Sequence, residues 1–304
     1  MSDTSPLQGK GLLITLACLF GTSILLAMST ILAKISSNLG IAPLPYLGYT
    51  TLASGIAMFA IAYARRLMPK ITLSILKYWF ISAIFGMAAP FIIIYSAVPY
   101  VGISFVALAL TFPPLFTYVG TLAMGMERFS ALRAAGVALA LSGAAVIAAA
   151  KLSAPSAAPI WIIGTLIAPL FLAAGNVYRS RHWPAGMRPE ALAPGMLAGA
   201  GLILLIAGLA PGLTLTMPLN QDVALLVIVQ ILNFTAQYTL FFILQHRGGP
   251  VMLSLIGAGS AIFGVPFAIL IMGEAAPGGL FLSAALILAG VWLTTWGGLK
   301  AKKP

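Results

Sequence analysis

Long stretches without charge are the feature that most constrains this chain. Of its 304 residues, 61% are hydrophobic and only 7% are charged. Soluble domains carry about 25% charged residues, which help to cover their surface. A chain so poor in charge cannot cover a water-exposed surface, and we therefore expect a membrane protein. Its apolar runs last about 20 residues and lack the alternation of barrel strands, which predicts an all-α polytopic fold.

Charged and turn residues divide the chain into ten apolar segments. Membrane helices are expected at 11–33, 43–64, 77–96, 101–124, 129–149, 159–178, 190–209, 222–244, 249–272 and 278–299. With both termini in the cytoplasm, 14 Lys and Arg residues fall on the inner side and only Lys34 and Lys151 on the outer side. This excess follows the positive-inside rule and predicts ten spans. Arg179 and Arg181 are interpreted as two of these topology signals, meeting lipid headgroups.

The two halves of the chain are related by a weak internal repeat. A shift of 147 residues superimposes several landmarks: Gly102 on Gly249, Leu108 on Leu255, Glu127 on Glu274, Leu139 on Leu286 and Gly143 on Gly290. We therefore expect two five-helix repeats, at 1–150 and 151–304. Because five is odd, the second repeat would insert upside down relative to the first. Inverted repeats of this kind are typical of transporters.

The landmarks at these boundaries also carry a family resemblance. Met124–Glu127 with Gly143, and Met272–Glu274 with Gly290, resemble the drug/metabolite transporter superfamily in its ten-helix branch. Within that branch the chain is most similar to the bacterial aromatic amino-acid exporters. The resemblance implies a cavity surrounded by the third, fourth, eighth and ninth spans, and a place in the bacterial inner membrane. Ser283, where the first half has Gly136, departs from strict symmetry.

The predicted spans carry no Asp, Glu, Lys or Arg near their middle. Ionisable groups at that depth are costly and usually mark a proton relay or an ion site. Their absence argues against a carboxylate-driven proton antiporter and against deep binding of a strongly anionic phosphate. We therefore expect an uncharged or zwitterionic substrate, moved by facilitation or exchange.

Uncharged polar residues are then the candidates for substrate binding. Gln230, Asn233 and Gln237 are spaced three and four apart in the eighth span, so they share one helical face. Their amides can both donate and accept, which suits an amino acid. Asn176 in the sixth span is a fourth candidate. The alternative is that these side chains only bridge neighbouring helices.

Aromatic residues of the third span are the second group of candidates. Phe91 and Tyr95 lie in this span, and an aromatic wall opposite the amides would receive a large apolar or aromatic side chain by stacking. Ordinary helix packing is the alternative for both residues.

Prolines and glycines predict the moving parts. The hinge candidates are Pro113 and Pro114 in the fourth span and Gly257, Gly259 and Pro266 in the ninth. Proline removes an intrahelical hydrogen bond and kinks a helix. Kinks at similar depth in both halves would allow alternating access, and static kinks are the alternative.

These features together predict an exporter of amino acids, aromatic or large apolar ones, in the bacterial inner membrane. A nucleotide-sugar or other metabolite carrier of the same superfamily is the alternative, but we expect it to need cations in its cavity. An intramembrane enzyme or scaffold is the alternative from another class. Ser260 lacks a histidine within the bilayer, since His182 and His246 lie in predicted turns. We expect no catalytic residues, no metal and no cofactor. The expected partners are a small-molecule substrate and the lipid bilayer, and we expect no nucleic acid. An oligomer is possible, but nothing in the sequence indicates one.

Overall fold

A computed structural model describes residues 10–123, 128–152, 159–218, 220–276 and 278–301. Within these ranges the chain is helical and contains no strand, so the all-α prediction is confirmed. The first half of the chain contains α1 (Lys10–Asn38), α2 (Pro43–Ala64), α3 (Leu73–Ala83), η1 (Ile84–Ala88), α4 (Ala89–Val101), α5 (Ile103–Ala109), α6 (Pro113–Ala123) and α7 (Ala131–Leu152). The remainder comprises α8 (Pro159–Arg181), α9 (Pro189–Ala207), α10 (Gln221–Ser254), α11 (Ile256–Leu270) and α12 (Leu280–Ala301).

Eight helical segments in the described part of the chain are long and apolar enough to cross a membrane. They are Leu13–Asn38, Pro43–Ala64, Leu73–Val101, Ile103–Gly120, Ala131–Ala150, Pro159–Arg181, Pro189–Ala207 and Gln221–Arg247. Two further apolar segments, Ile256–Leu270 and Leu280–Thr294, are shorter. A multi-pass membrane protein is therefore supported, with eight of the ten predicted spans meeting the length and hydropathy that a span needs.

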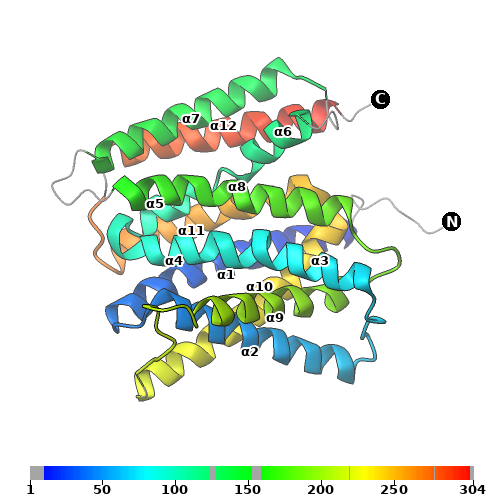
Figure 1. Ribbon diagram of the computed structural model, residues 1–304. Helices are drawn as coiled ribbons and strands as arrows, with labels where there is room; N and C mark the ends of the chain where they lie inside the picture. Colours follow the sequence, from blue (N-terminus) through cyan, green and yellow to red (C-terminus); the bar gives the residue numbers. More distant parts are fainter. Residues whose placement is uncertain (1–9, 124–127, 153–158, 219, 277, 302–304) are drawn as a thin grey trace.

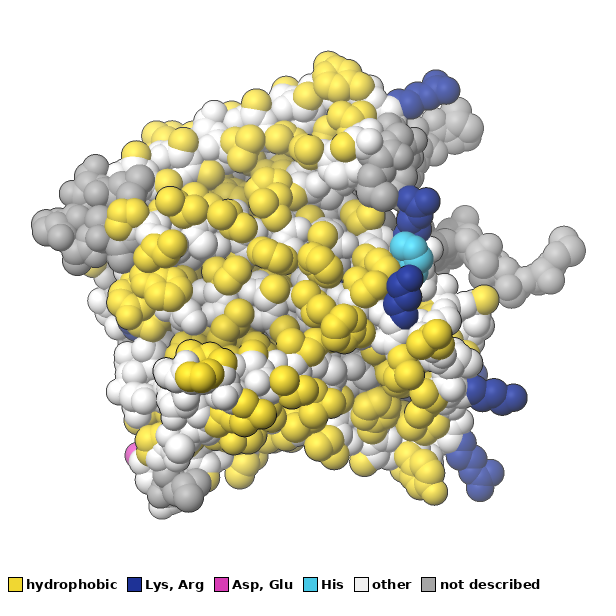
Figure 2. Space-filling view, viewed as in Figure 1, with side chains coloured by type: hydrophobic (Ala, Val, Ile, Leu, Met, Phe, Trp, Pro, Cys, Tyr) yellow, Lys and Arg dark blue, Asp and Glu magenta, His cyan; other side chains and the backbone are white. Residues whose placement is uncertain are grey.

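The helices lie side by side, with their long axes roughly aligned (Figure 1). α7 and α12 pair along one edge, and α2 packs against α9 at the opposite edge. The start of α1 and the end of α12 lie at the same end of the bundle (Figure 1). Figure 2 shows Lys and Arg side chains at this same end and an apolar flank beside them. Ile160 and Ile163 of α8 are exposed, as expected for side chains in contact with lipid.

The third span is interrupted by a single π-helical turn. The turn, η1, joins α3 to α4 and contains Gly86 and Met87, both buried. Pro90 follows it in the first turn of α4. A π-helical turn within an α-helix frequently occurs at a functional site, because it changes the direction of the side chains around it.

The fourth span is broken where the sequence predicted a kink. α5 ends at Ala109, three residues are non-helical, and Pro113 and Pro114 begin α6. The prolines therefore start a helix rather than bend one, because proline's missing N–H and fixed φ suit a first helical turn.

The break between the eighth and ninth spans lies further along the chain than predicted. We expected it at His246–Gly248, but α10 continues to Ser254 and only Leu255 separates it from α11. Glycine within a helix costs about 1 kcal/mol relative to alanine. Leu253 in the last turn of α10 is buried, so this end of the helix packs against the rest of the bundle.

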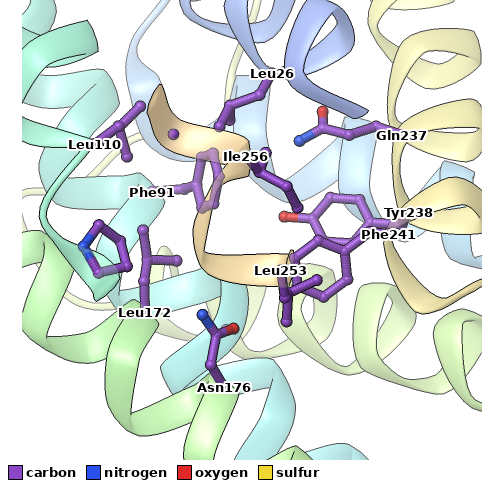
Figure 3. Close-up of a pocket in the computed structure, with 13 residues that line it drawn as sticks. Leu26, Phe91, Leu110, Leu172, Asn176, Gln237, Tyr238, Phe241, Leu253 and Ile256 are labelled. Carbon is purple, nitrogen blue, oxygen red and sulfur yellow. The ribbon is translucent and has the colours of Figure 1, made fainter. Parts of the chain in front are cut away.

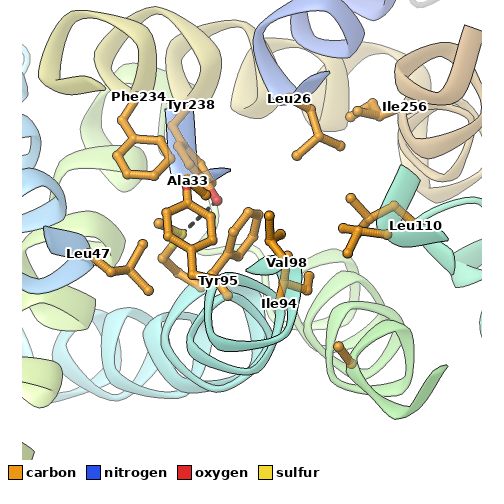
Figure 4. Close-up of a cluster of buried hydrophobic side chains, with 14 of the residues drawn as sticks. Leu26, Ala33, Leu47, Ile94, Tyr95, Val98, Leu110, Phe234, Tyr238 and Ile256 are labelled. Carbon is orange, nitrogen blue, oxygen red and sulfur yellow. Dashed lines mark hydrogen bonds between the residues drawn. The ribbon is translucent and has the colours of Figure 1, made fainter. Parts of the chain in front are cut away.

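The two broken helices cross in direct contact. A Cβ atom added at Gly257 would collide with the carbonyl oxygen of Leu110 and would lie 3.2 Å from the backbone nitrogen of Thr111. Figure 4 shows the neighbouring side chains of Leu110 and Ile256 facing each other across this crossing. Only a residue without a side chain allows the backbones to approach so closely.

Candidate functional site: a central cavity

A small cavity of about 50 Å³ lies where these broken helices meet η1, α1, α4, α8 and α10. Five of the residues singled out in the sequence line it: Phe91, Pro113, Asn176, Gln237 and Gly257. Its other walls are Leu26, Gly86, Leu110, Leu172, Tyr238, Phe241, Leu253 and Ile256. Figure 3 shows the Asn176 and Gln237 side chains on different sides of this space, with Phe91 between them. The cavity is therefore mostly apolar with a few polar groups, as small-molecule sites usually are.

Gln237 is held by a hydrogen-bond chain that begins at Asn233. The Asn233 amide nitrogen donates to the Leu25 carbonyl oxygen at 3.1 Å and to Ser29 Oγ at 2.7 Å. Ser29 Oγ in turn donates to Gln237 Oε1 at 2.8 Å. The oxygen of Gln237 is thus occupied, and in the described part of the chain its Nε2 has no acceptor. Gln237 therefore presents a hydrogen-bond donor to the cavity.

The other two amides of the α10 stripe bridge helices instead of lining the cavity. Gln230 is fully buried and accepts a hydrogen bond from the Tyr46 hydroxyl at 3.3 Å. The Asn233 amide nitrogen donates to α1, as described above, while Asn233 Oδ1 and Gln230 Nε2 are buried without a partner in the described part of the chain. The shared face predicted for the stripe is present, but Gln237 is its one member that lines this cavity.

The aromatic residues of the third span also divide between two roles. Phe91 lines the cavity and its ring meets that of Tyr95 edge-on, with centroids 6.0 Å apart. Tyr95 is buried behind it, where its hydroxyl donates to the Ser29 carbonyl oxygen at 3.2 Å. The sequence reasoning did not select Tyr238 and Phe241, which complete the aromatic wall from α10. Their positions one and four residues after Gln237 could have indicated them.

Asn176 is paired with a buried arginine. Arg179 Nη2 donates to Asn176 Oδ1 at 2.6 Å, and Arg179 Nε donates to Gln245 Oε1 at 3.2 Å. The guanidinium carbon lies 5.1 Å from the centroid of the Phe241 ring. Within the described part of the chain, no carboxylate forms an ion pair with Arg179, although its side chain is 0% exposed.

The interpretation of Arg179 as a cation among lipid headgroups is therefore wrong. α8 continues to Arg181, and side chains of a helix lean toward its N-terminus. Arg179 consequently points back into the bundle, toward Asn176 one turn earlier. Arg181, two residues later, is exposed as a topology signal should be. The three-residue spacing of Asn176 and Arg179 was the sequence signal for this pair.

The hinge candidates occupy different surroundings. Pro113 and Gly257 line the cavity, and Pro114 is buried next to Pro113. Gly259 faces α1, where an added Cβ would collide with Ser23 Oγ. Pro266 is exposed within the continuous helix α11. Among the boundary landmarks, 124–127 lies outside the described residues, whereas Glu274 accepts hydrogen bonds from the backbone N–H and hydroxyl of Ser104 at 3.1 and 3.0 Å.

Comparisons with known proteins agree with this architecture. No curated protein matches the chain significantly. One solved crystal structure aligns with 94% of this chain and 98% of its own, with a TM-score of 0.65 and 19% sequence identity. This likeness extends over nearly the whole chain and concerns the fold alone. Residues 13–149, a little under half of the chain, match the profile of the EamA-like transporter family, so the likeness to that family concerns the first half of the chain.

Proposed function

We propose that this protein exports amino acids with aromatic or large apolar side chains across the bacterial inner membrane. The observation that carries the proposal is the composition of the cavity wall. Phe91, Tyr238 and Phe241 supply rings for stacking, and Gln237 and Asn176 supply amide groups. An apolar side chain would lie against the rings, while the polar end of the amino acid would meet the amides.

Alternating access between two inverted halves is the proposed mechanism. The contact between α7 and α12 supports it, because it contains a reciprocal pair. An added Cβ at Gly143 would lie 2.8 Å from the Ser283 carbonyl oxygen, and one at Gly290 would collide with the Gly136 carbonyl oxygen. A shift of 147 residues converts Gly143 into Gly290 and Gly136 into Ser283, so each contact becomes the other when the halves are exchanged. Such reciprocity is expected of two halves related by a pseudo-two-fold axis.

The broken helices are the proposed hinges. Backbone groups freed by a break within a membrane must face protein or a wet cavity. The breaks after Ala109 and at Leu255 both adjoin the central cavity, where Leu110, Pro113 and Gly257 line its wall. Half-helices on either side of these breaks could tilt separately, opening one end of the cavity while closing the other.

Facilitated movement or exchange is the proposed form of energy coupling. The acidic side chains in the described part of the chain are Glu190, Asp222 and Glu274, and all three lie at helix ends or in a loop. A proton-coupled carrier would be expected to place a carboxylate beside the substrate. A pH gradient alone should therefore not drive concentrative uptake.

A nucleotide-sugar or other metabolite carrier is the second candidate. The buried position of Arg179 supports it, whereas the sequence alone indicated no cation near the cavity. We argued against such a carrier because no cation was expected near the cavity, whereas Arg179 lies directly behind the cavity wall. One guanidinium, however, carries a single positive charge, whereas the two phosphates of a nucleotide sugar are usually bound by several cations. Amino acids therefore remain the proposed substrate class.

Exchange of labelled phenylalanine across proteoliposomes tests the substrate. Wild-type protein should show saturable exchange, and Gln237→Ala should weaken it by about tenfold, as expected for a lost hydrogen bond to a charged group. Phe91→Ala should weaken it as well. Phe80→Ala is the matched control, because Phe80 belongs to the same span but is 57% exposed.

Two results of this experiment would contradict the proposal, one on the substrate class and one on the location of the binding site. If the wild-type protein exchanges nucleotide sugars and ignores amino acids, the amino-acid proposal is wrong and the second candidate is correct. If Phe80→Ala impairs exchange as much as Phe91→Ala does, the cavity is not the binding site.

A further inference from the structure

We infer that the central cavity selects substrates by their carboxylate, which is bound by Asn176 with Arg179 as its positioning residue and counter-charge. This inference rests on the proposed function and assigns the polar end of the substrate to one wall of the cavity. It concerns a residue pair that sequence reasoning had placed apart, one in the cavity and the other among headgroups.

Arg179 is a buried cation without a partner of opposite charge in the described part of the chain. An ionised group buried without a partner of opposite charge costs several kcal/mol. Arg179 is 0% exposed, and its partners in the described part of the chain are two amide oxygens, an aromatic ring and the Met196 sulfur at 3.8 Å. A guanidinium has five N–H donors, so this set leaves both its charge and part of its donor capacity unmatched. A carboxylate in the adjacent cavity would supply the missing negative charge.

The hydrogen bonds of the two cavity amides have the same direction, with each oxygen accepting from the protein. Because Arg179 Nη2 donates to Asn176, the Asn176 oxygen must face the guanidinium and its amide nitrogen is left for the cavity. In the described part of the chain, that nitrogen has no acceptor. Gln237 is oriented in the same sense by Ser29, so both cavity amides present donors. Figure 3 shows the nitrogen of each pointing toward the space between them. Two donors and a cation behind them suit an anionic group better than an ammonium group.

A glycine lies between the Arg179 guanidinium and the cavity. Gly86 lines the cavity within η1, and an added Cβ would collide with Arg179 Nη1. Gly175 on α8 also packs here, since its Cβ would lie 3.1 Å from the same nitrogen. The absence of side chains at both positions lets the guanidinium approach the cavity wall.

A ligand-stability assay tests the inference without requiring transport. Purified protein is heated in detergent with phenylpropionate, which keeps the carboxylate, with phenylpropionamide, which replaces it by a neutral amide, or with phenethylamine, which keeps only the ammonium group. Wild-type protein should be stabilised by phenylpropionate at concentrations about 10- to 100-fold lower than by the other two, as expected for hydrogen bonds to a charged group. Arg181→Gln, which removes an exposed cation two residues away, should keep this preference.

Two variants distinguish recognition from a merely structural role. Arg179→Gln should lose the preference for phenylpropionate, and Arg179→Lys should restore only part of it, because lysine lacks the planar fork. Asn176→Asp should give the buried guanidinium a carboxylate partner, so the unliganded protein should melt at a higher temperature. The same variant should lose its affinity for phenylpropionate, because the carboxylate introduced at position 176 pairs with the Arg179 guanidinium in place of the ligand.

The outcomes are separable from those of the proposed function. If the wild-type protein does not exchange phenylalanine but is still stabilised selectively by phenylpropionate, the substrate is wrong and the carboxylate site stands. If wild-type protein shows no preference for phenylpropionate, or Arg179→Gln and Asn176→Asp keep that preference, the inference is overturned and Arg179 serves only to pack the helices.

Discussion

The crossing of the two broken helices provides the sharpest structural prediction. An added Cβ at Gly257 would lie 2.5 Å from the Leu110 carbonyl carbon, whereas ordinary contacts begin at 3.4 Å. Gly257→Ala therefore requires the two backbones to separate by at least about 0.9 Å to clear this carbon and by more to clear the Leu110 carbonyl oxygen, and both are main-chain atoms that cannot rotate away. Overpacking of this kind costs about 1 to 3 kcal/mol. We expect Gly257→Ala to lower the melting temperature of the purified protein and to slow transport.

Gly264 offers a matched control on the same helix. It is also buried in α11, but its Cβ would lie 3.6 Å from that of Ala107 and 3.7 Å from that of Ala27, which are ordinary contacts. Gly264→Ala should leave stability unchanged or raise it by up to about 1 kcal/mol, because alanine favours a helix. Both variants are measured by thermal unfolding in detergent and by exchange in proteoliposomes. Equal melting temperatures for the two variants would refute the close crossing at Leu110.

Three further predictions concern contacts elsewhere in the bundle. Gly290→Ala should destabilise the α7–α12 pair by about 1 to 3 kcal/mol, because the added Cβ would collide with the Gly136 carbonyl oxygen. Gly120→Ala is the control and should not destabilise the protein, because nothing lies within 4 Å of its added Cβ. Equal thermal stability of these two variants would contradict this packing. Glu274→Ala should remove the acceptor of the Ser104 N–H and speed hydrogen exchange at the start of α5, an effect absent if that contact does not form in solution. Tyr46→Phe should cost about 1 kcal/mol of unfolding free energy, because Gln230 loses its donor; an unchanged melting temperature would show that this bond contributes nothing.

Much of the fold was predictable because a bilayer imposes a simple rule on the sequence. Helices satisfy their own backbone hydrogen bonds, so apolar runs of about 20 residues indicate spans without knowledge of their partners. The helical class and the order of the segments follow from this rule. The end of α10 did not, because Gly248 and Gly249 resemble a break, and only packing of the following turn decides whether a helix continues.

Which residues line the cavity was less predictable than the fold, because it depends on how the helices pack. The spacing of Gln230, Asn233 and Gln237 placed them on one face, but a spacing does not say which helix that face meets. Packing against α1 and α2 gives each of the first two interhelical hydrogen bonds and buries their remaining amide atoms, Gln230 Nε2 and Asn233 Oδ1, away from the cavity. It leaves a donor of Gln237 for the cavity.

What the sequence determined by itself is an all-helical, multi-pass membrane chain with its cations gathered at the helix ends, because hydropathy and charge act residue by residue. What only the tertiary structure decided is which polar groups are occupied and which remain free. Arg179 shows the difference most clearly. Its position near the end of a span made it look like a solvated cation, but the tilt of helical side chains and the gap at Gly86 turn it inward to Asn176. Burial and hydrogen bonding depend on neighbours that are distant in the sequence, and these neighbours are fixed only when the helices pack.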